Sequence, residues 1–310
     1  MGKENIPEHV LKIIKLDDIH ACRSYLRVVT DYLFDLSFAL RDKGYHSIRM
    51  AESSIWVQMM FTNALAFSKL LEGMPYAKDG LWLNPIIDHR MIYSLGRTMY
   101  ENLIAFELVY IIPSNDDEKQ LMYCLYEAAG YKEQLEVLSD DLKARNPEKT
   151  KVIQDSLNAA ISEAKATAFY QSANKQTQEV INNAFKSGRY RYVILPDKTL
   201  KKVEWDDGMK CMGIQSDIFD GMYKYFSNLS HPSHWGQLQF EQSFEKLQPE
   251  YINLACTATR FVLSFLSLFI VDFMKLVPEA KDVLNQQTYD NQQMIQFFNG
   301  IFRKNSFLGV

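Results

Sequence analysis

Residues 84–113 read NPIIDHRMIYSLGRTMYENLIAFELVYIIP, and they contain the clearest helix signals of the chain. It opens with Asn84-Pro85-x-x-Asp88, which is typical of a helix N-cap followed by proline at the first helical position. Apolar residues with few charges then continue to residue 112. There Pro113 blocks the helix, because proline disfavours the α conformation in the residue before it. The stretch therefore predicts a long helix with mostly apolar surroundings.

Helical signals flank this stretch on both sides. Caps and apolar periodicity predict further helices over about 19–40, 47–71, 114–145, 146–187, 215–229, 249–277 and 286–303, the last being a C-terminal helix. The start near 114 depends on Ser114-x-x-Asp117, which resembles a capping box. An irregular link of fifteen residues rich in Gly and Pro, closing with Asn84-Pro85-x-x-Asp88, joins the second helix to the central one.

One segment breaks the helical pattern. Residues 190–195, YRYVIL, are aromatic and β-branched, Pro196-Asp197-Lys198 supplies a turn, and residues 199–205 alternate again. This arrangement predicts a small β-hairpin near residues 190–205. No repeat of 20–50 residues is present, and no stretch resembles a flexible tether. We therefore expect an all-α multi-helix bundle forming one domain over 1–310, with a hairpin insert at about 189–206.

Composition restricts the class of protein. The chain has 310 residues, 47% hydrophobic and 23% charged, and a net charge of −4. These values exclude a mainly disordered chain and argue against a protein dedicated to coating duplex DNA. The four scattered cysteines are typical of reduced thiols in the cytosol. The longest uncharged stretches, 55–68 and 261–271, are shorter than a membrane span needs. We expect a soluble cytoplasmic protein.

The common catalytic signatures are missing. The sequence contains no GxxxxGK[ST], GxGxxG, HExxH, ExxH or GxSxG. A standard nucleotide, flavin or di-metal enzyme is therefore not indicated, and we expect no cofactor and no bound metal.

The first candidate site lies on the central helix. His89, Tyr93, Arg97 and Glu101 are spaced four residues apart, so Arg97 and Glu101 are neighbours on one helix face. Charges in apolar surroundings must be paired or must face a cavity. Two interpretations are open, a structural ion pair and a site that faces a ligand or an RNA phosphate.

The second candidate site is residues 223–234, YKYFSNLSHPSH. Pro232 disfavours the α conformation at His231, so Ser230 and His231 should lie at the end of a helix. Histidine there is a candidate acid or base, or it simply caps carbonyl groups. His231-x-x-His234 is half of a metal site, but no third ligand is indicated.

A third pattern, Arg41-Asp42-Lys43-Gly44-Tyr45-His46, also combines arginine with histidine. Spacings of this kind occur by chance in a chain of this composition. A helix end with a glycine stop explains residues 41–44.

Together these residues suggest a family. Arg97-x-x-x-Glu101, Trp205, and Tyr225 followed by Leu229-Ser230-His231-Pro232 resemble a group of uncharacterised bacterial all-helical proteins. That group is similar to the HEPN superfamily (higher eukaryotes and prokaryotes nucleotide-binding). The resemblance spans roughly residues 30–275. It implies a helical bundle, often dimeric, and many HEPN proteins are metal-independent ribonucleases of toxin or phage-defence systems. Their catalytic pattern is Arg, four to six residues, then His.

This chain departs from that pattern, because no arginine lies four to six residues before His231. Arg41 and His46 have the right spacing but lie between the first two helices. Either Arg97 supplies the arginine from another helix, or the protein is a non-catalytic member. As an enzyme, His231 would transfer protons at the ribose 2′-OH or the 5′-oxygen, and Arg97 would stabilise the phosphate.

In that enzyme Glu101 would orient the arginine, and Tyr225 and Ser230 would donate hydrogen bonds. In the non-catalytic alternative the same residues hold the central helices together, and the protein is an interaction or sensor module in bacterial stress or phage defence. We favour the module, with a metal-independent endoribonuclease using Arg97 and His231 as the alternative.

The predicted hairpin is locally basic. Residues 186–210 contain seven basic residues against four acidic ones. Aromatic rings interleaved with cations suit single-stranded RNA. The basic residues expected to bind it are Arg189, Arg191, Lys201 and Lys202, and the aromatic ones are Tyr190, Tyr192 and Trp205. Alternatively, the hairpin is solvated and its aromatics pack on the helices beneath.

The C-terminal segment is strongly apolar for a chain end. Its apolar residues are Met294, Ile295, Phe297, Phe298, Ile301, Phe302, Phe307 and Leu308. Packing on the core of the same chain and homodimerisation are the two explanations.

Overall fold

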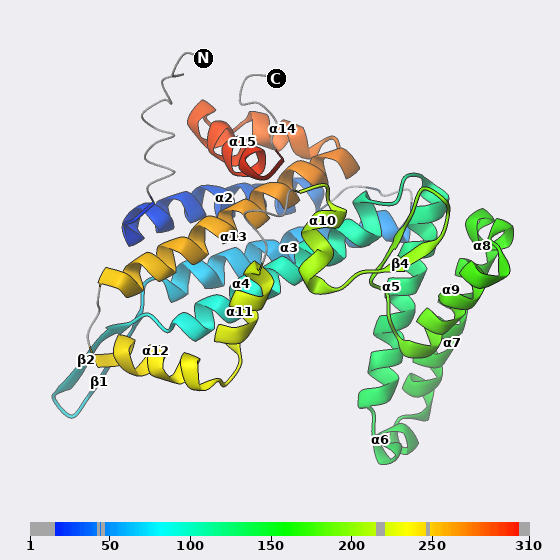
Figure 1. Cartoon of the computed structure of the whole chain (residues 1–310), viewed down its shortest axis with the longest axis horizontal. Helices are drawn as coiled ribbons and strands as arrows, with labels where there is room; N and C mark the ends of the chain where they lie inside the picture. Colours follow the sequence, from blue (N-terminus) through cyan, green and yellow to red (C-terminus); the bar gives the residue numbers. More distant parts are fainter. Residues whose placement is uncertain (1–15, 42–43, 45–46, 215–220, 246–248, 304–310) are drawn as a thin grey trace. The chain divides into compact units, whose positions relative to one another are not determined.

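The computed structural model describes residues 16–41, 44, 47–214, 221–245 and 249–303 (Figure 1). Contacts within the chain form two compact units. Unit 1 comprises residues 1–104 and 213–310, and unit 2 comprises residues 105–212. The described residues are mainly α-helical, with two small antiparallel strand pairs, which confirms the all-α fold with a hairpin insertion. That the whole chain forms one domain stays a prediction.

Unit 1 is built around two long helices that contact each other. Its helices are α2 (Ile19–Leu40), α3 (Ile48–Leu70), α4 (His89–Phe106), α11 (Met222–Ser230), α12 (His234–Glu245), α13 (Pro249–Leu276), α14 (Ala280–Asn285) and α15 (Tyr289–Arg303). Helix α2 packs against both α3 and α13, and α14 and α15 pack against this core (Figure 1). Of the residues expected in a helix at 215–229, those at 215–220 lie outside the described residues.

The starts of α2 and α3 follow local capping rules. The Asp18 carboxylate accepts a hydrogen bond from the backbone N–H of His20, and the Ser47 hydroxyl accepts one from Met50. Each bond satisfies a donor that the first turn of a helix leaves without a partner. Both helices therefore begin where the sequence predicts.

A second hairpin replaces the predicted irregular link. Strands β1 (Met74–Lys78) and β2 (Leu81–Ile86) pair antiparallel, with Lys78 opposite Leu81. Asp79 and Gly80 between them both have positive φ, 51° and 78°. Two central residues with positive φ are what a type I′ turn requires, and Asp-Gly is its usual sequence. The expectation of an irregular link was therefore wrong, although the turn signal was present.

The central helix begins later than predicted. Asn84 and Pro85 lie in β2, where proline is tolerated because an edge strand leaves its N–H side without a partner. Asp88 is the cap instead, since its side chain accepts from the backbone N–H of Arg90 at 2.9 Å. The chain then stays helical through α4 and the π-helix η1 (Glu107–Ile111). This helical stretch ends just before Pro113, as predicted.

Helix α13 is the most apolar element of unit 1. Residues Ile252–Leu276 are long and apolar enough to cross a membrane by length and composition, and 72% of the most apolar window is buried inside the chain. Asp272 of α13 is a fully buried carboxylate, and it accepts from Arg303 Nη1 of α15 at 2.9 Å. A buried charge must be paired, so this bond ties the C-terminal helix to α13.

The C-terminal segment packs on its own chain. Met294, Ile295, Phe297, Phe298 and Phe302 of α15 are buried, and α15 contacts α13. Phe307 and Leu308 lie outside the described residues. Packing within the chain therefore accounts for most of the apolar character of this segment, and the homodimer stays a prediction.

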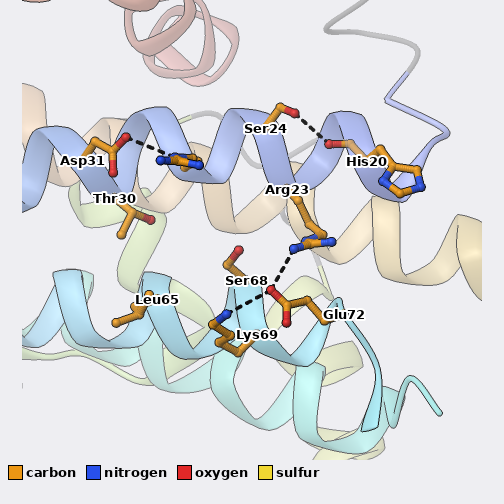
Figure 2. Close-up of a pocket in the computed structure, with 10 residues that line it drawn as sticks. His20, Arg23, Ser24, Thr30, Asp31, Leu65, Ser68, Lys69 and Glu72 are labelled. Atoms are coloured by element: carbon orange, nitrogen blue, oxygen red, sulfur yellow. Dashed lines mark hydrogen bonds and ion pairs between the residues drawn. The ribbon is translucent and has the colours of Figure 1, made fainter. Parts of the chain in front are cut away.

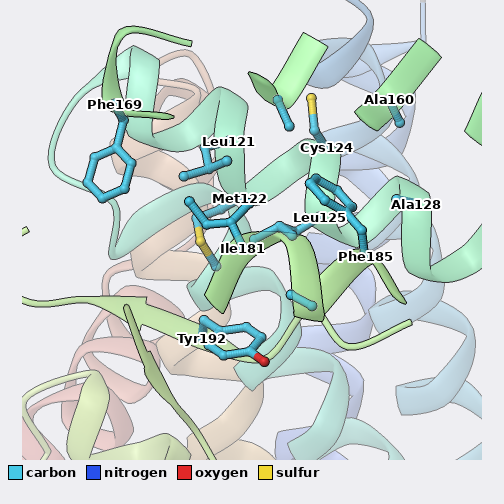
Figure 3. Packing of buried hydrophobic residues seen from close by; sticks show 12 residues of the cluster. Leu121, Met122, Cys124, Leu125, Ala128, Ala160, Phe169, Ile181, Phe185 and Tyr192 are labelled. Carbon is cyan, nitrogen blue, oxygen red and sulfur yellow. The ribbon is translucent and has the colours of Figure 1, made fainter. Parts of the chain in front are cut away.

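Unit 2 is a second helical assembly with its own core. Its elements are η1, α5 (Asp116–Val137), α6 (Asp140–Arg145), α7 (Pro147–Ala166), α8 (Ala168–Ser172), α9 (Lys175–Ser187), β3 (Tyr192–Ile194), β4 (Leu200–Lys202), the 3₁₀ turn η2 (Trp205–Asp207) and α10 (Gly208–Cys211). Helix α5 packs against α7, α8 and α9. Figure 3 shows the buried cluster between them, in which Leu121, Ile181 and Phe185 meet.

The long helices predicted in unit 2 are interrupted. The helix expected over 114–145 breaks at Ser139, and the one expected over 146–187 breaks at Thr167 and Asn174. At each break the side chain caps the next helix by accepting a hydrogen bond from its first turn. Short polar side chains compete with the helix in this way wherever tertiary packing favours a turn.

The start of α5 also differs slightly from the prediction. Asn115, rather than Ser114, is the N-cap, accepting from the backbone N–H of Glu118 at 2.9 Å. Ser114 instead donates from its hydroxyl and its backbone N–H to the Glu118 carboxylate, at 2.6 and 2.9 Å. The arrangement resembles a capping box shifted by one residue, except that Glu118 bonds the residue before the N-cap rather than the N-cap itself.

Candidate functional site

The candidate site forms where α4 and α11 approach each other within unit 1. Gly96 of α4 makes this approach close, because a Cβ atom there would lie 3.0 Å from Cε1 of Phe226 in α11. Phe226 is fully buried, and its ring centroid is 5.3 Å from that of Tyr93. The glycine beside Arg97 thus lets α11 place its side chains against α4.

Arg97 connects the two helices. Its Nε donates to Oε1 of Glu101 at 2.8 Å, and its Nη1 lies 3.4 Å from the Ser227 hydroxyl and 2.9 Å from Nε2 of His231. A guanidinium can only donate, so Nε2 of His231 accepts in this contact, and the neutral imidazole carries its proton on Nδ1. The predicted Arg97, Glu101 and His231 are therefore brought together.

Tyr223 completes the group. Its hydroxyl donates to Oε1 of Glu101 at 2.9 Å, and the Arg97 guanidinium lies 5.2 Å from its ring centroid. Burial, followed by the neighbouring Glu101 carboxylate, raises the pKa of Tyr223 to about 12. Its hydroxyl thus keeps its proton at neutral pH and remains a donor. We call Arg97, Glu101, Tyr223, Ser227 and His231 the Arg97 cluster.

Two of the predicted site residues lie elsewhere. The Tyr225 hydroxyl is 3.3 Å from that of Tyr93, and the two rings meet edge to face. The Ser230 hydroxyl donates to the carbonyl of Phe226 in its own helix at 2.6 Å. In this structure neither hydroxyl forms a hydrogen bond to Arg97 or to Glu101 among the described contacts.

Tyr223 and Ser227 were missed, although the sequence contains a signal for both. Tyr223, Ser227 and His231 are spaced four residues apart, as Arg97 and Glu101 are, so each set occupies one face of its helix. Facing polar stripes of this kind predict a contact between two helices. No local rule identifies which helix is the partner.

The Arg97 cluster is only partly exposed to solvent. The side chains of Arg97 and Glu101 are 24% and 28% exposed, and His231 at the end of α11 is exposed. An exposed imidazole can exchange protons with water or a substrate. The bond from Arg97 occupies Nε2, however, so action as a base at that nitrogen requires the Arg97–His231 contact to open.

The described pockets lie away from the cluster. Two pockets run along α2, and neither is lined by any residue of the Arg97 cluster. Over the described parts of the chain, no three His, Cys, Asp or Glu side chains come together in a way that could hold a metal ion. Arg41 follows the end of α2, while His46 lies outside the described residues.

The predicted hairpin insert lies in unit 2, where Tyr192 pairs with Lys202 and Ile194 with Leu200. The Arg191 guanidinium lies 4.4 Å from the Trp205 ring centroid and 3.7 Å from Glu204. The hairpin is therefore confirmed, with its arginine stacked on an aromatic ring of the same unit.

The other aromatic and basic residues of this insert contact unit 2 or solvent. Tyr192 is buried in the core of unit 2, and the Tyr190 ring centroid is 5.1 Å from that of Tyr126. Lys202 pairs with Glu204, while Arg189 and Lys201 are exposed. The rings thus contact neighbours within the unit, and single-stranded RNA as a partner stays a prediction.

Comparison of the chain with protein-family models, with curated proteins and with solved structures found no match.

Proposed function

We propose that this protein is an HEPN-like interaction or sensor module of the bacterial cytoplasm that acts in stress or phage defence. In this proposal the Arg97 cluster is a structural lock. Its guanidinium contacts a carboxylate, a hydroxyl, an imidazole and an aromatic ring, and these groups come from two helices. A guanidinium bonded in this way through Nε and Nη1 holds α4 and α11 together.

The observation that carries the proposal is the exposed β1–β2 hairpin. Every side chain of β1 is exposed, and Trp82 of β2 is 82% exposed. Because Tyr76 pairs with Leu83 and Ala77 with Trp82, apolar side chains cover both faces of the ribbon. An isolated two-stranded hairpin is marginally stable in water, and exposed apolar patches mark interaction sites. We infer that a protein partner covers this hairpin.

The experiment compares partner capture by three forms of the full chain. Wild type, a Tyr76→Ser/Trp82→Ser double variant and a Val137→Ser control are used as bait in bacterial lysate. Val137 is the matched control because it is 83% exposed and lies on α5 of unit 2. We expect a defined set of proteins with wild type and the control, lost with the double variant. Identical capture by all three forms would reject the hairpin as the interaction element.

A second candidate function is a metal-independent endoribonuclease, favoured by the 2.9 Å contact between Arg97 Nη1 and His231 Nε2. An incoming RNA phosphate would take the guanidinium from His231 and free Nε2 to accept the ribose 2′-OH proton. The protonated imidazole would then return a proton to the 5′-oxygen that leaves. Glu101 would keep the guanidinium in position through its bond to Nε.

The test incubates mixed RNAs with the purified chain, with and without a chelator. We expect cleavage that survives the chelator and falls about 10²–10⁴-fold in His231→Ala. Ser230→Ala is the matched control, since its hydroxyl bonds only its own helix among the described contacts. Equal RNA turnover by wild type and His231→Ala would exclude the nuclease.

A further inference from the structure

A groove of about 500 Å³, lined mainly by charged and polar residues, runs between α2 and α3 in unit 1. Figure 2 shows Arg23 of α2 reaching Glu72, which follows the end of α3, while Lys69 of α3 bonds the same carboxylate. None of these residues belongs to the Arg97 cluster. The groove is thus a second place on unit 1 where charged side chains meet solvent.

Among the residues that line this 500 Å³ groove, basic residues outnumber acidic ones. Arg23 Nη2 and Lys69 Nζ both bond the same oxygen of Glu72, Oε1, at 2.7 and 3.1 Å. Arg27 pairs with Asp31 at 3.5 Å. Three cations therefore share two carboxylates, and Glu72 alone holds two of those cations.

Arg23 has an unused donor at this point. Its Nε is buried and has no hydrogen-bond partner among the described residues, while its Nη2 bonds Glu72. Nε and Nη2 form one edge of the guanidinium, the edge that binds two oxygens of one anion in a bidentate pair. Glu72 thus bonds one end of this edge, and no acceptor among the described residues bonds the other end.

An adjoining pocket of about 410 Å³ continues the groove past this arginine. The two pockets share His20, Arg23 and Glu72. Two acidic residues, Asp17 and Asp18, line the second pocket together with the apolar residues Ile19, Leu71, Pro85, Ile87 and Ile252. A ligand with an anionic group at Arg23 could therefore place an apolar body against these residues.

We propose that this groove binds a small organic phosphate. The phosphate takes the place of the Glu72 carboxylate, bonding the Nε and Nη2 edge of Arg23 and the ammonium of Lys69. With Glu72 displaced, these two side chains carry two positive charges, which match the two negative charges of a phosphate monoester. The apolar body of the ligand lies in the adjoining pocket. That this ligand is the signal of a sensor module rests on the proposed function. The binding of the ligand to the groove does not.

The experiment titrates the full chain with inorganic phosphate and with phenyl phosphate by calorimetry. We expect phenyl phosphate to bind more tightly than phosphate, because its ring removes apolar surface from water. Arg23→Gln and Lys69→Gln should each weaken binding about 10-fold, which corresponds to the loss of one charge-assisted bond. Glu72→Gln should instead strengthen binding about 5-fold, because it frees both cations.

Asp141→Asn is the matched control for a general gain of positive charge. Asp141 forms an exposed ion pair with Arg145 at 2.8 Å on α6 of unit 2, outside the groove. The Asp141→Asn variant should bind phenyl phosphate with the same affinity as wild type. Four outcomes would each overturn the proposal. They are unchanged binding in Arg23→Gln, weaker binding in Glu72→Gln, a gain in affinity in Asp141→Asn equal to that in Glu72→Gln, and equal affinity for phenyl phosphate and inorganic phosphate.

This titration uses the chain alone and so separates the two proposals. If the Tyr76→Ser/Trp82→Ser variant and wild type capture the same proteins while phenyl phosphate still binds the groove, only the interaction proposal fails. If the variant loses capture and phenyl phosphate does not bind wild type, only the phosphate site fails.

Discussion

Arg97 is bonded to two helices at once, yet about a quarter of its side chain remains exposed. Arg97→Ala leaves the Glu101 carboxylate with the Tyr223 hydroxyl and with water. We therefore expect a loss of about 1–2 kcal/mol in the free energy of unfolding, less than the 3–5 kcal/mol of a fully buried pair. Urea denaturation measures this loss.

A double-mutant cycle with Tyr223→Phe tests whether the two residues act together. We expect a coupling of about 0.5–1 kcal/mol, because both side chains bond the same oxygen of Glu101. If the double variant loses the sum of the free energies of unfolding that the two single variants lose, the structural lock is contradicted.

The ionisation of a single residue, Glu118, makes the stability of the folded protein depend on pH. Burial raises the pKa of this carboxyl, but Lys198 at 2.5 Å and the two donors of Ser114 outweigh burial and lower the pKa to about 2. A carboxyl with a lowered pKa in the folded state stabilises the protein above its unfolded pKa of about 4.5. That stabilisation, on the order of 3 kcal/mol, is lost as pH falls from about 4.5 to 2.

Denaturation of wild type and Glu118→Gln across this range tests the effect. We expect wild type to be the more stable at pH 7 and the two curves to converge towards pH 2. Glu148→Gln is a control, since Glu148 is exposed in the first turn of α7. Parallel curves for wild type and Glu118→Gln would show that Glu118 is not the titrating group.

At the scale of an element, Gly73 determines how β1 leaves α3. Its φ is +73°, and a Cβ atom there would lie 2.9 Å from Cβ of Pro85 in β2. Gly73→Ala should therefore cost about 2–3 kcal/mol, through left-handed strain and a clash with a rigid ring. Chemical denaturation followed by circular dichroism gives the value.

Gly130→Ala is the opposite case and serves as the control. Gly130 lies inside α5, and a Cβ atom there would meet no atom within 4 Å. Since alanine favours a helix over glycine, this variant should gain about 0.5–1 kcal/mol. A Gly73→Ala protein as stable as wild type would mean that the hairpin moves freely away from α3.

At the scale of the whole molecule, the C-terminal helix bears on both stability and assembly. The buried phenylalanines of α15 and the Arg303–Asp272 pair hold this helix on α13. Deleting residues 287–310 should therefore lower the free energy of unfolding sharply, because it exposes apolar surface of α13 and leaves Asp272 with Lys275 alone among its described ion pairs.

Light scattering on the full chain tests the homodimer separately. A homodimer should scatter with twice the chain mass of 36.0 kDa. A mass of one chain at micromolar concentration would end the dimer proposal, whatever the deletion does to stability.

Local sequence signals account for much of the fold. Proline at 113 and the cap at Ser47 act within a few residues, so the ends of these helices follow from the sequence alone. The Asp79-Gly80 turn belongs to the same class, and the hairpin it forms was open to prediction. The break at Thr167 was not, because the same residue is tolerated inside a helix unless packing favours the cap.

The candidate site likewise contains some contacts that local sequence rules predict and others that they do not. The proximity of Arg97 and Glu101 follows from the sequence alone, since a spacing of four residues places two side chains on one face of any helix. Tertiary packing adds Tyr223 and Ser227 to this pair, brings His231 into contact with Arg97, and leaves Tyr225 and Ser230 outside the group. The choice depends on the rotation of α11 against α4, which the packing of Phe226 over Gly96 sets. Such a contact joins residues 130 positions apart, so no local rule specifies it.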